Sequence, residues 1–111
     1  MLNQVVLVGR LVRDPELRKT DTNKSVTSIT LAIPRSFKNA NGEYETDFID
    51  CQLWEQTAKA TCEYTNKGDI VGVKGRIQSR VVEENNNKKY LTEIIAEKVT
   101  FLSSKKEEKT A

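Results

Sequence analysis

The sequence predicts an all-β domain of five strands, with one helix between the third strand and the fourth. Most of its apolar segments alternate with polar residues at the period of two that a half-buried strand requires. One segment, residues 55–68, instead repeats small and apolar residues at helical spacing. The chain has 111 residues, 37% hydrophobic and 31% charged, which suits a single globular domain with one core.

The first strand is predicted at residues 4–12, which are mostly β-branched and apolar. Gly9 lies within this segment and indicates a bulge or a bend. Residues 13–23 are polar and rich in turn-forming residues, so we expect them to form a loop.

The second strand is predicted at residues 25–35, where apolar and polar residues alternate. Pro34 has no amide proton to donate to a neighbouring strand, so we expect the strand to end or bulge there. Residues 36–45 follow as a hairpin, and Asn41-Gly42 is its turn signal.

The third strand, predicted at residues 46–54, has an unusual outer face. Its inner face is an ordinary core face made of Ile49, Cys51 and Leu53. The opposite face carries Phe48 and Trp54, two of the largest apolar side chains in the protein. A strand with a good core face has no evident reason to present such rings to solvent. From the residues alone, the rings either bind a ligand or pack under a loop or against another subunit.

The helix predicted within residues 55–68 is followed by two more strands, at residues 69–80 and 90–102. Residues 82–89 between them are polar and are expected to form a flexible hairpin loop. This order of elements is that of the OB-fold, a small, partly open Greek-key barrel. An SH3-like barrel or another small α+β fold fits the same pattern.

Composition argues against an enzyme. The chain has no histidine and two cysteines, which excludes the usual zinc sites and the commonest general base. Cys51 and Cys62 are expected to be small core residues rather than a disulfide. No phosphate-binding loop or nucleophile elbow occurs, and we expect no cofactor and no metal, although a site made of carboxylates alone stays open.

Charge and hydropathy limit the partners and the location. Residues 1–38 hold seven Lys/Arg and three Asp/Glu, whereas residues 39–66 hold one and six, so the positive charge is segregated along the chain. Solvated surface charge explains any one such segment equally well. No apolar run approaches the roughly 20 residues that span a bilayer. No signal peptide is recognisable either, and we expect a cytoplasmic protein.

Six motifs occur in a fixed order along residues 1–103. They are N-x-V-x-L-V-G-R-L (3–11), D-P-E-L-R (14–18), S-F-K-N-x-x-G-E (36–43), D-F-I-x-C-x-L-W (47–54), A-x-x-x-x-E-Y-x-x-K-G (58–68) and V-x-G-R-I-Q-S-R (73–80). In this order the motifs resemble those of the bacterial single-stranded DNA-binding protein family. The resemblance implies an OB-fold protomer, usually in a homotetramer. It also implies sequence-independent binding of single-stranded DNA in replication, repair, recombination or DNA uptake.

The resemblance also implies which residues contact DNA. Base stacking is expected from Phe37, Phe48 and Trp54, because every base offers a ring face to an aromatic side chain. Contacts to the phosphates are expected from Arg10, Arg13, Arg18, Arg35, Lys38, Lys74, Arg76 and Arg80.

The chain departs from the family pattern at several positions. Val82 replaces an aromatic residue, and Lys19 stands where relatives often carry another. Asp50 places a carboxylate between two stacking residues, so we expect it to lie at a rim or to pair with an arginine. Residues 104–111 are expected to be a short, charged, disordered tail. Many relatives instead end in an acidic tip, so we expect a short form of the family without partners that bind such a tip.

Three alternatives remain from the sequence. A primosome-type OB protein binds DNA mainly to bridge other replication proteins and does not need several aromatic residues on one face. A protein-interaction module would use the exposed aromatic residues as a subunit interface. A nuclease with a carboxylate-bound metal would degrade an oligonucleotide in the presence of Mg²⁺.

Overall fold

The fold is known from a computed structural model that describes residues 1–103. The elements are β1 (Val5–Leu11), β2 (Arg18–Lys19), β3 (Ser25–Lys38), β4 (Tyr44–Trp54), α1 (Glu55–Tyr64), β5 (Ile70–Glu84) and β6 (Asn87–Phe101). The predicted tail at residues 104–111 lies outside the described part of the chain. Within residues 1–103, no helix has the length and apolar character needed to cross a membrane.

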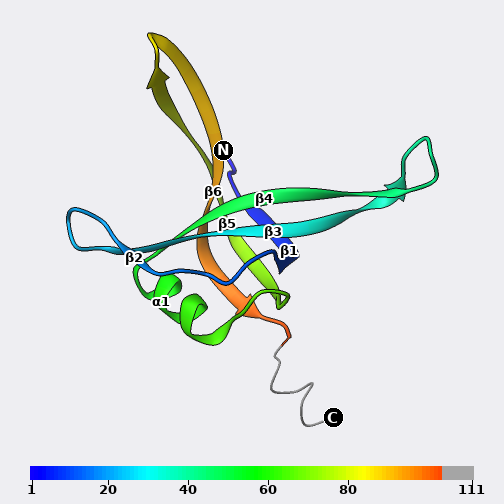
Figure 1. The fold of residues 1–111 in the computed structure, drawn as a ribbon, viewed down its shortest axis with the longest axis horizontal. Coiled ribbons are helices and arrows are strands. Elements are labelled where there is room, and N and C mark those ends of the chain that lie inside the picture. Colours follow the sequence, from blue (N-terminus) through cyan, green and yellow to red (C-terminus); the bar gives the residue numbers. More distant parts are fainter. Residues whose placement is uncertain (104–111) are drawn as a thin grey trace.

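The five long strands close into a barrel. Their order is β1-β5-β6-β4-β3, and β3 pairs again with β1 at Leu31 and Ala32 to close the ring. Among the strands of residues 1–103, all pairings are antiparallel except the short β4–β6 contact. The predicted all-β OB-fold with one helix is confirmed, and α1 lies between the third and fourth long strands (Figure 1).

The barrel interior is filled by the inward faces of all five long strands. Its fully or nearly fully buried residues include Leu11, Ile29, Leu31, Cys51, Leu53, Val71 and Val73. The helix α1 contributes Ala58 to the same core. Both cysteines are free, as expected. Cys51 is fully buried in the core, and this burial raises the pKa of its thiol to about 12.

Two long hairpins project from the barrel in different directions (Figure 1). One is formed by β3 and β4, and the other by β5 and β6. In the first hairpin, β3 continues beyond Pro34 to Lys38, with an irregular register between these two residues. The sequence predicted an end or a bulge at Pro34, and the bulge is what the structure has.

The second hairpin corrects one prediction. Residues 82–89 form no flexible loop, because the β5–β6 ladder continues to the pair Glu84 and Asn87. Asn85 and Asn86 make the turn with φ values of 52° and 67°. Positive φ at both central residues is the geometry of the tight hairpin turn that keeps two strands paired, and asparagine tolerates it. The two-residue strand β2 was also missed, since two polar residues carry no periodic signal.

Gly75 has a steric reason to be glycine. A Cβ atom at this position would lie 2.1 Å from the backbone oxygen of Ile95. The close approach coincides with a register shift between Lys74 and Gly75 in the β5–β6 ladder. Two residues further along β5, the Asn3 side chain donates to the Ile77 carbonyl and accepts from the Ile77 amide, both at 2.8 Å. These contacts hold the start of the chain against β5 where β5 bends away from the barrel.

Candidate nucleic-acid interface

The outward side chains of β3 and β4 form one continuous surface, which we call the β3–β4 outer face. It consists of Val26, Ser28, Thr30, Ala32, Phe48, Asp50, Gln52 and Trp54. Residues directly opposite each other in an antiparallel pair point to the same side of the sheet. The ladder therefore arranges these eight residues as four cross-strand rows.

The row that contains Phe48 ends in an arginine. Phe48 is 65% exposed and lies opposite Ala32 on β3, which lies opposite Arg10 on β1. An aromatic ring and a cation thus share one row across three strands. The Arg10 guanidinium donates to the Gly68 carbonyl at 2.6 Å, which holds the side chain at the edge of the row.

The row that contains Trp54 likewise combines an aromatic ring, an aliphatic residue and an arginine. Trp54 is 42% exposed and lies opposite Val26, which lies opposite Arg18 on β2. Trp54 is paired with Val26 in the ladder, and the side-chain carboxylate of the next residue, Glu55, accepts a hydrogen bond from the Ser25 amide at 2.8 Å. Glu55 also adopts a left-handed φ of 52°, which turns the chain from β4 into α1.

The two rows between the aromatic residues are polar. In one of them, the Gln52 amide donates to the Ser28 hydroxyl at 3.2 Å. In the other, the Thr30 hydroxyl donates to an oxygen of Asp50 at 2.6 Å and accepts from Arg13 at 2.9 Å. Asp50 was expected to lie at a rim or to pair with an arginine. It lies within the face instead, and among the described residues its link to Arg13 runs through Thr30.

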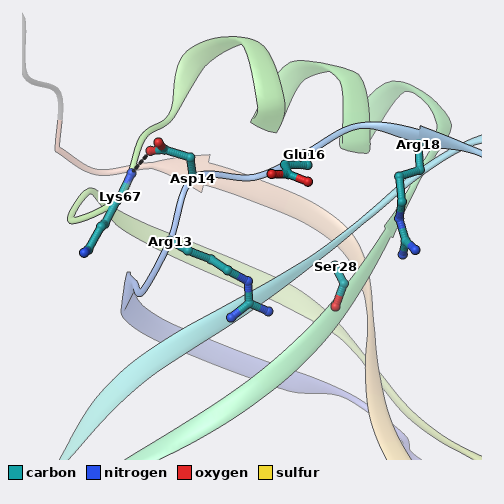
Figure 2. A pocket seen from close by; sticks show the side chains of 6 residues that line it. All are labelled: Arg13, Asp14, Glu16, Arg18, Ser28 and Lys67. Atoms are coloured by element: carbon teal, nitrogen blue, oxygen red, sulfur yellow. Dashed lines mark hydrogen bonds between the residues drawn. The ribbon is translucent and has the colours of Figure 1, made fainter.

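Two adjoining hollows border this face. One, of about 490 Å³, lies beside Trp54 and is lined by Arg18, Thr20, Val26, Ser28, Gln52, Trp54, Gln78, Arg80, Glu93 and Ile95. The other, of about 510 Å³, is lined by Arg13, Asp14, Glu16, Arg18, Ser28 and Lys67 (Figure 2). The hollows share Arg18 and Ser28, so a path with three arginines runs past the tryptophan. Asp14 accepts from the backbone amide of Lys67 at 2.6 Å, which ties the loop after β1 to the segment before β5.

The tip of the β3–β4 hairpin carries another aromatic and basic group. Phe37 is 65% exposed and lies in the bulged segment, where strand alternation does not determine which way it faces. Lys38 lies opposite Tyr44, and its ammonium is 5.7 Å from the centre of that ring. Tyr44 is exposed and shares strand parity with Phe48, so the tip extends the line of exposed aromatic residues beyond Phe48.

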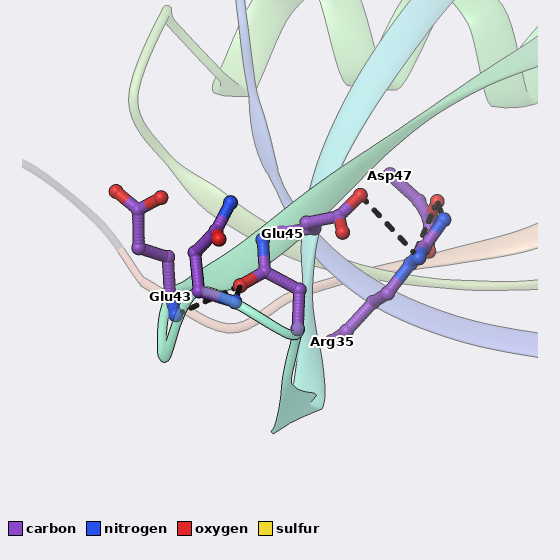
Figure 3. A network of polar contacts seen from close by, with 6 residues as sticks. Arg35, Glu43, Glu45 and Asp47 are labelled. Atoms are coloured by element: carbon purple, nitrogen blue, oxygen red, sulfur yellow. Dashed lines mark hydrogen bonds and ion pairs between the residues drawn. The ribbon is translucent and has the colours of Figure 1, made fainter.

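Arg35 is paired with two carboxylates within the same hairpin (Figure 3). Its Nη2 and Nε atoms donate to the two oxygens of Asp47 at 2.9 and 3.1 Å, and Nη1 lies 3.5 Å from Glu45. This hydrogen bonding lowers the pKa of the Asp47 carboxyl and raises the pKa of the guanidinium. Asp47 and Phe48 are consecutive residues of β4, so their side chains point to opposite faces of the strand. Arg35 therefore lies on the side of the hairpin that faces away from that ring.

The remaining predicted cations lie on β5. Arg80 is ion-paired with Glu93 at 3.1 Å and lines the hollow beside Trp54. Arg76 is ion-paired with Glu97 at 3.3 Å, across the β5–β6 ladder. Lys74 lies opposite Val6 of β1, away from the aromatic residues. The structure thus brings Arg10, Arg13, Arg18 and Arg80 to the aromatic face and leaves Lys74 apart from it.

Sequence reasoning missed the polar residues of the face. The one sequence signal that could have placed these residues on the face is strand parity, which Ser28, Thr30 and Gln52 share with the aromatic residues. Their pairing depends on the β3–β4 register, which the sequence does not give.

Comparison with known proteins gives a consistent result. The sequence matches the profile described as the single-strand binding protein family over residues 2–102. It is 51% identical over 112 residues to single-stranded DNA-binding protein B of Bacillus subtilis, covering 100% of this chain and 99% of that protein. It is 51% identical over 106 residues to single-stranded DNA-binding protein 3 of Listeria innocua, covering 95% of this chain and 66% of that protein. It is 50% identical over 107 residues to single-stranded DNA-binding protein 1 of Lactococcus lactis, covering 96% of this chain and 71% of that protein.

Proposed function

Because the chain belongs to the single-strand binding protein family, we propose that it binds single-stranded DNA along the β3–β4 outer face. The affinity arises from base stacking and phosphate contacts, and neither of these requires a particular sequence. The protein would protect exposed strands in replication, repair, recombination or DNA uptake. Its activity is binding rather than catalysis.

One observation carries the assignment of this face. Two exposed aromatic rings, Phe48 and Trp54, each share a cross-strand row with an arginine, Arg10 and Arg18. A single strand needs both kinds of group at short intervals, since its bases stack on rings while its phosphates require cations. Arg13 and Arg80 supply further positive charge beside the same face.

Intrinsic fluorescence tests the assignment directly. Trp54 is the only tryptophan in the chain, so its emission reports one known position in each protomer. Titration with a deoxythymidine oligomer should quench the emission strongly, because a stacked base lies against the indole. Repeating the titration over a salt series should give an affinity that falls linearly on logarithmic axes. Binding that leaves the emission unchanged would place the DNA elsewhere on the protein.

We further propose that the protein assembles as a homotetramer in which β1 pairs with its counterpart across a two-fold axis. One edge of β1 is paired with β5 along Val5–Arg10. On the other edge, β1 pairs with β3 only at Arg10 and Leu11, so within residues 1–103 no strand pairs with that edge along residues 5–9. Val6 and Val8 are 71% and 52% exposed on the same strand. An open, apolar strand edge readily pairs with another strand.

The mass of the protein in solution tests this assembly. Light scattering at micromolar concentration should give a tetramer. A Val6→Pro variant that retains its circular dichroism spectrum should form smaller species, because proline interrupts the ladder. A monomeric wild type, or a folded proline variant that assembles unchanged, would contradict the proposal.

A further inference from the structure

The polar centre of the β3–β4 outer face suggests that binding is not uniform over the four bases. Stacking accounts for the two ends of the face, at Phe48 and Trp54. It does not account for Asp50, a carboxylate that repels phosphates and lies two residues from Phe48 on the same side of the strand. A group that weakens phosphate contacts at the middle of a DNA-binding face requires a different role.

The hydrogen bonds around Asp50 leave it available to a ligand. Arginine can only donate, so the Thr30 hydroxyl, which accepts from Arg13, directs its own proton to Oδ1 of Asp50. This contact fixes the orientation of the carboxylate. Within residues 1–103, Oδ2 of Asp50 has no hydrogen-bond or ion-pair partner, and the residue is exposed. The face therefore presents a fixed oxygen that accepts hydrogen bonds and cannot donate them.

Asp50 is close enough to Phe48 along β4 to reach the edge of a base stacked on that ring. Residues two apart along a strand are separated by about 7 Å. A base stacked on Phe48 therefore turns one of its edges toward Asp50. Bases differ at these edges, and a carboxylate accepts from the amino group of cytosine. Guanine offers two adjacent donors, N1–H and the exocyclic amino group, whereas the single N–H donor of thymine is flanked by two carbonyl oxygens that a carboxylate repels.

We propose that Asp50 is a specificity-determining residue, which shifts the base preference of this face toward guanine and cytosine and away from thymine. The proposal rests on the proposed function and adds a base preference to it. Stacking and phosphate contacts still supply most of the affinity. Asp50 changes the ratio of the affinities for different DNA sequences.

The experiment compares deoxycytidine and deoxythymidine oligomers of equal length, together with a thymidine oligomer that contains isolated guanines. Affinities are measured by Trp54 quenching for the wild type, Asp50→Asn and Asp50→Ala, above the pH at which cytosine is protonated. Asparagine keeps an oxygen for Thr30, so the fold should be retained, and a thermal melt checks this. The cytidine-to-thymidine affinity ratio should fall by roughly three- to tenfold in both variants, as expected for loss of a partly solvated hydrogen bond.

Two outcomes would overturn the proposal. The first is a cytidine-to-thymidine ratio that stays the same while both affinities rise by one common factor, since the carboxylate would then act through repulsion alone. The second is a guanine-containing oligomer that binds no better than plain thymidine to the wild type.

Glu63→Gln is the matched control, because it removes one exposed carboxylate from α1, away from this face. It should leave the ratio unchanged. Wild-type binding of thymidine with quenching of Trp54 tests the proposed function separately. Failure of the base preference therefore remains distinguishable from failure of DNA binding.

Discussion

Replacing Trp54 with alanine should weaken binding of single-stranded DNA and leave its salt dependence unchanged. The indole is 42% exposed in the free protein, so its outer face is available to a base. Loss of one stacked base costs about 1–3 kcal/mol, which corresponds to roughly fivefold to 150-fold in affinity. Phe48 and Phe37 remain in this variant, so binding should be reduced and not abolished.

The salt dependence separates stacking from charge. The alanine variant removes no phosphate contact, so the slope of log affinity against log salt concentration should match that of the wild type. The variant lacks intrinsic tryptophan fluorescence, so the anisotropy of a labelled deoxythymidine oligomer is the appropriate assay. Trp54→Phe, which retains a ring, should recover part of the lost affinity.

Tyr64→Ala provides the matched control for Trp54→Ala. Tyr64 is more exposed, at 63%, but lies on α1 with its ring centre 6.0 Å from that of Phe101, and it lines neither hollow. Its loss should leave affinity unchanged. The assignment of the face fails if Trp54→Ala binds as the wild type does, or if the two alanine variants weaken binding equally.

Three further predictions concern charge, packing and pH. Arg80→Ala should lower the affinity and also reduce the salt slope by about 0.7, the value for one phosphate contact on a single strand; an unchanged slope would remove Arg80 from the interface. Gly75→Ala should destabilise the fold by about 1–3 kcal/mol or more in urea unfolding, because its Cβ would lie 2.1 Å from a backbone oxygen. Gly72→Ala, with its nearest contact at 3.5 Å, should be tolerated. The pKa of Asp47, followed by NMR, should lie below its usual value and return to it in Arg35→Ala. The lowered pKa stabilises the fold at pH values above the usual carboxyl pKa, and this contribution should be lost as the pH falls through the lowered value.

Local alternation was sufficient to predict the strands and the aromatic face, but it also fitted an SH3-like barrel or another small α+β fold, and the family resemblance favoured the OB-fold. The strand at Tyr44–Trp54 alternates regularly, so the facing of Phe48 and Trp54 follows from residue parity. The resemblance to a known family then gave a role to rings that folding alone does not explain. The cross-strand rows were not predictable, because they depend on how β3 aligns with β1, β2 and β4.

The least predictable features lie where the ladders are irregular. Two extra residues between Pro34 and Lys38 break the alternation of β3, so the sequence could not give the carboxylate partners of Arg35. The tight turn within three consecutive asparagines was not predicted, because the sequence does not show which two of them adopt positive φ.

The way in which Trp54 is held has a thermodynamic consequence. The residue is the last of β4, paired with Val26 on one side and followed on the other by Glu55, whose carboxylate accepts from the Ser25 amide. Its backbone therefore has little conformational entropy left to lose when a base arrives, since folding has already ordered it. A ring on a loose loop would lose part of its stacking energy to ordering at every binding event. With the platform ordered in advance, the entropy lost on binding comes mainly from the DNA, whose own stiffness should then influence how tightly each sequence is held.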